Sequence, residues 1–202
     1  MLFSSILKIN SYSLYKYFNL GDLNEKKFVL NIDYLFVYQH NLHELYSLKF
    51  EYNENLNRLI LSLINKKIDY IFLFYDSKNI IHSSGVCSSS KPDDKFFYDF
   101  QEKKYAVILS THTHKQYRGK QYYKKALQLQ IKNIIEKLNI SDIFISTLKV
   151  EKKLSPLDSN NFKKFSSGQL FSLFNKIHIY VIFGNSIRIR IFFNDNLIIK
   201  FK

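Results

Sequence analysis

A change of hydrophobic period between Lys103 and Leu148 constrains the fold more than any other feature of the sequence. The stretch "KKYAVILSTHTH" (Lys103 to His114) is apolar and β-branched, which is typical of a strand. Residues 120–138 carry apolar side chains at helical spacing, and "DIFISTL" (Asp142 to Leu148) returns to a strand pattern. A strand, a helix and a strand joined by short connections predict a right-handed parallel crossover.

The helix predicted for residues 120–138 is amphipathic. Four of its lysines mostly lie on one side of the helical wheel, so that side is expected to face solvent. The other side is expected to pack on a sheet. The apolar stripe that would do so comprises Tyr123, Leu127, Ile131, Ile134 and Leu138.

Further elements precede this crossover. A strand is predicted within Phe28 to Tyr38, and "DYIFLFYDSKNIIHSSGV" reads as two strands around turn residues 76–79. Between them a helix is predicted, with Asn53 as its cap. Its apolar face comprises Leu56, Leu59, Ile60, Leu63 and Ile64.

The end of the sequence has a different pattern. "SPLDSNNFKKF", entered through Ser155-Pro156, predicts a short helix. "KIHIYVIF", "IRIRIFF" and "LIIKF" follow, joined by turn residues 184–185 and 194–196, and predict three strands of an antiparallel meander. The fold class is therefore α/β, with a mixed and mostly antiparallel central sheet, one parallel strand–helix–strand unit, and helices on both faces.

Composition bounds the class of protein. A chain of 202 residues that is 46% hydrophobic suits one compact domain, over residues 1–202. The single cysteine and the absence of a signal-peptide pattern or a long apolar run favour a cytoplasmic protein without a membrane span. The net charge of +13 suits an anionic partner, but the lysines form no long basic run, so a nucleic-acid binder is not favoured.

The corner between the strong strand and its helix holds one of only five glycines, Gly119, between Arg118 and Lys120. Backbone amides at the start of a helix lack intrahelical acceptors and attract anions. A residue without Cβ lets a diphosphate approach the main chain, and the strand edge at Thr111 and Thr113 could hydrogen-bond an amide-bearing arm. These features together describe a site for coenzyme A.

The stretch "THTHKQYRGKQYYKKAL" resembles motif A of the GNAT superfamily of acyl-CoA N-acyltransferases, whose pattern is (Gln or Arg)-x-x-Gly-x-(Gly or Ala). A local "YRGK" likeness is to members associated with sugar and polysaccharide modification. Gln121 stands where the family has its second Gly or Ala, so its side chain must point away from the phosphates. The implied cofactor-binding residues are Thr111, Thr113, Gln116, Tyr117, Arg118, Gly119, Lys120, Gln121, Tyr122 and Tyr123.

The resemblance implies direct attack of an amine on the thioester of acetyl-CoA, and a base to take up the amine's proton. His112, Tyr105 and Glu102 are candidate bases, and Ser159 falls near a family Asn-x-x-Ser pattern. The tyrosine that often protonates the leaving thiolate in the family has no counterpart here. His82, on the preceding hairpin, is a candidate for lining the acceptor pocket.

We therefore expect an N-acetyltransferase that uses acetyl-CoA and acts on a small primary amine, with an amino sugar suggested by the local likeness. The alternative is a catalytically silent module of the same fold that binds acyl-CoA or a partner protein. No metal is expected. The last strand, Leu197 to Lys202, is a candidate for pairing with a second copy of the chain.

Overall fold

The computed structural model describes residues 7–17, 32–48, 53–76, 79–88, 104–148, 157, 161–174, 176–183, 187–194 and 196–201. The chain divides into two compact units. The larger unit comprises residues 17–145 and 154–162, and the smaller unit comprises residues 1–16, 146–153 and 163–202. Each is described by itself, and the expectation of a single domain over residues 1–202 stays a prediction.

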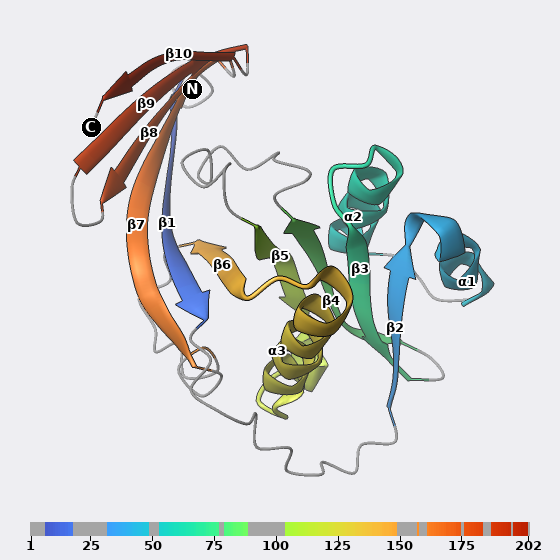
Figure 1. Cartoon of the computed structure of the whole chain (residues 1–202). Helices are drawn as coiled ribbons and strands as arrows, with labels where there is room; N and C mark the ends of the chain where they lie inside the picture. Colours follow the sequence, from blue (N-terminus) through green and yellow to red (C-terminus); the bar gives the residue numbers. More distant parts are fainter. Residues whose placement is uncertain are drawn as a thin grey trace. The chain divides into compact units, whose positions relative to one another are not determined.

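The larger unit contains a mixed sheet in the strand order β6–β5–β4–β3–β2 (Figure 1). Parallel pairing joins β5 to β6, from Tyr105 opposite Asp142 to Ile108 opposite Ile145, and the other neighbours are antiparallel. The predicted crossover and the mostly antiparallel sheet are thus confirmed. The strands are β2 (Asp33–Tyr38), β3 (Tyr70–Tyr75), β4 (Ile80–Ser88), β5 (Tyr105–Thr113) and β6 (Asp142–Leu148).

One face of this sheet is covered by α2 (Glu54–Ile64), which begins as predicted. The side chain of Asn53 accepts a hydrogen bond of 2.9 Å from the amide of Leu56. Four apolar side chains of α2 are buried, each worth about 2 kcal/mol when removed from water. Ile64, predicted to join them, is instead 45% exposed; it is the last residue of the helix.

The opposite face is covered by α3 (Tyr122–Asn133), which continues into a wider π-helical turn, η5 (Ile134–Leu138). Leu127, Ile131 and Ile134 of the predicted stripe are fully buried. Asn139 ends the helix in the left-handed conformation with φ 53°, as is common after helix ends. A 3₁₀ turn, η2 (Gln39–Asn41), and the short α1 (Leu42–Ser47) connect β2 towards α2.

The smaller unit contains strands in the order β10–β9–β8–β7–β1. The predicted meander is confirmed as β8 (Ile177–Phe183), β9 (Ile187–Phe193) and β10 (Asn196–Phe201), although turn residues 184–185 lie outside the described residues. β10 is the last strand in this order, so one of its edges has no neighbouring strand in it. Pairing of that edge with a second copy of the chain stays a prediction. β1 spans Leu7–Tyr17.

The short helix predicted in "SPLDSNNFKKF" is wrong from Phe162 onwards. Residues Phe162–Leu173 form β7, which pairs antiparallel with β8 from Ser167 opposite Phe183 to Leu173 opposite Ile177. The spacing of Phe162 and Phe165 imitates one helical turn, but pairing with a strand far along the chain determines the structure. Of the preceding part, Leu157 is helical and Ser155-Pro156 lies outside the described residues.

Candidate functional site

A β-bulge at Ser110 organises the end of β5. Leu109 lies opposite Gly85 and His112 lies opposite Ser83, so two residues of β5 face the single residue Ser84 of β4. Ser110 takes up the extra length in the left-handed conformation, with φ 52°. Side chains after the bulge therefore point to the opposite sides from those that an unbroken strand would give.

Helix α2 holds this bulge in place through Asn55, one residue after the first of the helix. Its Nδ2 atom donates 3.0 Å to the carbonyl oxygen of Ser110 and 3.1 Å to the hydroxyl of Ser83. No local sequence pattern identifies Asn55, because an Asn in the first turn of a helix is common and its partners are 28 and 55 residues away.

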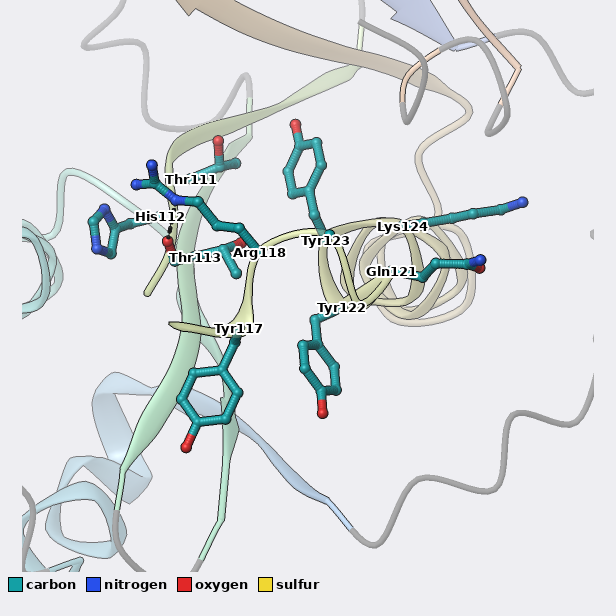
Figure 2. Close-up of a pocket in the computed structure, with 10 residues that line it drawn as sticks. Thr111, His112, Thr113, Tyr117, Arg118, Gln121, Tyr122, Tyr123 and Lys124 are labelled. Carbon is teal, nitrogen blue, oxygen red and sulfur yellow. Dashed lines mark hydrogen bonds between the residues drawn. The ribbon is translucent and has the colours of Figure 1, made fainter. Parts of the chain in front are cut away.

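After the bulge, the two threonines point to the α3 side of the sheet. Thr113 lies opposite His82, and the two side chains are joined at 2.8 Å between Oγ1 and Nδ1. Thr111 shares this side and hydrogen-bonds Tyr123 of α3. His112 points the other way, as Figure 2 shows. Side chains thus alternate from Thr111 to Thr113, and the bulge determines which set faces α3.

The corner between β5 and α3 contains one 3₁₀ turn, η4 (Lys115–Tyr117), and two left-handed residues. Gly119 has φ 79°, which only glycine adopts readily, and a Cβ added there would meet nothing within 4 Å. Gln121 precedes α3 with φ 62° and ψ 8°. Gln121 thus has a left-handed backbone conformation, which glycine adopts with less strain than any other residue.

Some backbone amides of the corner are already engaged. Those of Tyr117 and Arg118 donate to the carbonyl oxygens of His114 (3.0 Å) and Lys115 (3.2 Å). The first hydrogen bond of α3 runs from Lys125 to Gln121, at 3.1 Å. For the amides of residues 119–124 the structure records no acceptor among the residues it describes. The amides available to an anion are therefore those of residues 119–124.

All of these residues except Lys120 line a pocket of about 660 Å³ between the end of β5 and the first turn of α3 (Figure 2). The side chains of Gln121 and Lys124 point away from the group formed by Thr111, Thr113 and Arg118. The lining residues are Thr111, His112, Thr113, Tyr117, Arg118, Gly119, Gln121, Tyr122, Tyr123 and Lys124.

Arg118 supplies positive charge at the rim of the pocket. Its Nε atom donates 3.1 Å to the carbonyl oxygen of Thr113, which positions the guanidinium and leaves its terminal nitrogens to face solvent. Lys120 lies over the Tyr117 ring, with Nζ 5.6 Å from the ring centre. An anion at this corner would meet the positive end of the α3 dipole and a guanidinium together.

The predicted cofactor-binding residues are thus brought together with two differences. Gln116 and Lys120 are exposed at the same corner but do not line the pocket. Tyr117 and Arg118 contribute their side chains, since their amides are used within η4.

The candidate bases are not brought together. His112 borders the pocket, whereas Tyr105 is 2% exposed at the start of β5, about 20 Å away along an extended strand. Glu102 and Ser159 lie outside the described residues. Burial, and then the neighbouring Arg118 and His114, lower the pKa of His112 below its usual 6.5. His112 is therefore neutral at pH 7 and able to accept a proton.

His82 lies behind the pocket wall rather than in it. It is 1% exposed, and its ring centre lies 5.8 Å from that of Tyr123. Burial, and then the nearby His112, lower the pKa of His82 to about 3. It is a neutral, buried side chain in contact with two residues that line the pocket.

Within the described ranges, no three His, Cys, Asp or Glu side chains come together in a way that could hold a metal ion. Among the helices that the structure describes, none is long and apolar enough to cross a membrane.

The comparisons with known proteins bear on the fold. Neither a scan against protein-family models nor a search of curated proteins gives a match. A GNAT-family acetyltransferase from Colwellia psychrerythraea resembles the chain with a TM-score of 0.50 at 15% identity, over 78% of this chain and 53% of the other. The chain therefore spans about half the length of that protein, and the likeness supports a GNAT-like fold.

Two further structures are similar to a lesser degree. A predicted acetyltransferase with acetyl-CoA from Clostridium acetobutylicum has a TM-score of 0.43 at 14% identity, over 65% of this chain and 90% of the other. A functionally unknown conserved protein from Staphylococcus epidermidis has a TM-score of 0.46 at 8% identity, over 89% of this chain and 64% of the other.

Proposed function

We propose that the chain is a GNAT-type acyltransferase that moves an acetyl group from acetyl-CoA to a primary amine, with amino sugars as the first acceptors to test. One observation carries the proposal. The amides of residues 119–124 have no recorded acceptor among the described residues, and all of these residues except Lys120 line a pocket of about 660 Å³ beside Arg118. Several aligned amides at a helix start are the arrangement that binds phosphate groups.

The residues present fit the cosubstrate. The open space next to the Gly119 α-carbon admits a phosphate, and Arg118 can pair with it. The end of β5 extends past the last recorded pair with β6, Ile108 with Ile145, so the backbone at Thr111 to Thr113 is placed to bond an amide-bearing arm. A pyrophosphate would lie at the corner, and the arm would follow β5.

The proposed reaction needs few protein groups. The amine nitrogen attacks the thioester carbonyl carbon, the carbon–sulfur bond breaks, and CoA leaves as a thiolate. The proton that the amine gives up passes to a base, and His112 is the candidate that borders the pocket in neutral form. Holding both reactants in one pocket supplies most of the rate enhancement.

Binding of acetyl-CoA is the first test. At a concentration 100 times Kd, a ligand that binds only the folded state adds about 2.7 kcal/mol of stability, which raises the Tm by roughly 5–10 °C. Arg118→Glu should abolish this shift. Lys115→Glu is the matched control, because it makes the same charge change on the same corner outside the pocket. Equal loss in both variants, or no shift in the wild type, would contradict the proposal.

Turnover is the second test. Release of free CoA thiol should depend on an added amine from a panel of amino sugars, polyamines and amino acids. The silent module remains the second candidate because Tyr105, one of the two candidate bases among the described residues, is buried away from the pocket and leaves His112 alone of the two at its border. Acetyl-CoA binding without thiol release for any amine in the panel would favour it.

A further inference from the structure

His82 connects the core of the larger unit to the pocket wall. It is fully enclosed, its Nδ1 atom lies 2.8 Å from Oγ1 of Thr113, and its ring packs on Tyr123 and Phe72. Thr113 in turn accepts the Nε hydrogen of Arg118 on its carbonyl oxygen. One buried side chain thus holds the residue that positions the cationic rim of the pocket.

The second ring nitrogen indicates which tautomer His82 adopts. Its Nε2 atom is buried and has no hydrogen-bond partner among the described residues. An N–H group buried without an acceptor is rarer in proteins than a buried acceptor without a donor. The proton therefore resides on Nδ1, which donates to the Thr113 oxygen.

This assignment determines what Thr113 can do. A threonine hydroxyl is one donor and an acceptor of up to two hydrogen bonds. With its oxygen accepting from His82, its own hydrogen is left to donate elsewhere. Thr113 faces the α3 side and lines the pocket that lies between β5 and α3, so that hydrogen can rotate to point into the pocket.

We propose that Thr113 is a specificity-determining donor for a carbonyl oxygen of the ligand's amide-bearing arm, and that His82 is the positioning residue that orients it. This inference rests on the proposed use of acetyl-CoA. It assigns to two side chains a part of arm recognition that the sequence analysis gave to backbone groups alone.

The test compares two ligands that differ only in the arm: acetyl-CoA, and 3′-phosphoadenosine 5′-diphosphate, which keeps the phosphates. Thr113→Val preserves shape and removes the hydroxyl, so it should weaken acetyl-CoA about five- to tenfold, the effect of one hydrogen bond. Binding of the armless ligand should stay within twofold. A role in packing alone would weaken both ligands equally and would overturn the proposal.

A double-mutant cycle tests the part played by His82. His82→Phe should weaken acetyl-CoA binding as much as Thr113→Val does, and the double variant should bind no more weakly than either, because one change disorients and the other removes the same Thr113 donor. His82→Asn, whose amide can reach the same oxygen, should restore binding to within twofold. Independent, additive losses would overturn the positioning role. Should His82→Phe fail to fold, His82→Asn and Thr113→Val still decide the question.

The two ligands also separate failure of this inference from failure of the proposed function. If the wild type binds neither ligand, the proposed function fails and this inference fails with it. If the wild type binds both and Thr113→Val changes the binding of neither, only this inference fails.

Discussion

The hydroxyl of Tyr117 donates a hydrogen bond of 2.8 Å to Oδ2 of Asp76, which joins the corner before α3 to the turn between β3 and β4. Asn79 donates 3.3 Å to the same hydroxyl, and Asp76 and Asn79 are themselves joined by two hydrogen bonds. The hydrogen bond with Asp76 is the main reason that the pKa of Tyr117 is raised. The corner is therefore anchored at a point 41 residues away in the sequence.

Tyr117→Phe should release this anchor. Loss of one hydrogen bond to a carboxylate at a partly exposed site should lower the free energy of unfolding by about 1 kcal/mol. Tyr122→Phe is the matched control, since the structure records no partner for the Tyr122 hydroxyl among the described residues and both rings border the pocket. Urea denaturation measures both. An equal effect of the two substitutions would show that the Asp76 contact contributes nothing.

Gln121→Gly should stabilise the protein. A left-handed conformation costs a non-glycine residue roughly 1–2 kcal/mol, and glycine removes most of that cost while adding some entropy to the unfolded chain. We expect a net gain of about 0.5–1 kcal/mol. Lys120→Gly, one residue earlier and without a positive φ, should lower the free energy of unfolding by about 0.5–1 kcal/mol. Calorimetric Tm values that move in the same direction for both would contradict the strain argument.

His112 should give the reaction its acid limb. Burial, and then Arg118 and His114, lower the pKa of His112, so its imidazole stays neutral down to a pH below 6.5. Once the imidazole is protonated, it can no longer take up the proton of the amine. A plot of kcat/KM against pH should therefore fall on the acid side of pH 6.5 in the wild type. His112→Gln should be slower and should lack this limb, whereas His114→Gln, at an exposed position outside the pocket, should keep it. An unchanged limb in His112→Gln would assign the base elsewhere.

His82 should make the fold sensitive to acid. Its pKa is about 3 in the folded protein and about 6.5 when unfolded, so between these values only the unfolded chain takes up the proton. The contribution of His82 to stability is complete above pH 6.5 and is lost as the pH falls towards 3. Between pH 7 and pH 5 the loss is on the order of 2 kcal/mol. Urea denaturation should show this loss in the wild type and not in His82→Asn. An equal fall in the free energy of unfolding with pH in both proteins would contradict it.

The sequence was sufficient to predict those parts of the site that local patterns determine. The strand before Thr113, the stripe that buries Leu127 and Ile131, and the Asn53 cap all follow from spacing or from a capping preference within one segment. The glycine at position 119 was likewise identified, because its neighbours and the helix after it form a local motif.

The remaining features depend on partners distant in the sequence. The bulge at Ser110 adds one residue without changing the apolar pattern, and its contact with Asn55 crosses 55 residues. The link between His82 and Thr113 depends on strand register, which the bulge itself sets. The strand Phe162–Leu173 was missed because pairing with β8 decides its conformation against a helix-like spacing.

The extra residue at Ser110 reverses the side of the sheet to which odd-numbered side chains of β5 point. Upstream of it, odd-numbered residues such as Leu109 contact the α2 layer; downstream, odd-numbered residues such as Thr113 contact the α3 layer. An unbroken strand in which Ser110 was paired like its neighbours would exchange the two sets, placing the imidazole of His112 beneath α3 and both threonine hydroxyls on the far layer. The chemical character of the pocket wall therefore depends on one irregularity in strand pairing as much as on the identity of any side chain in it.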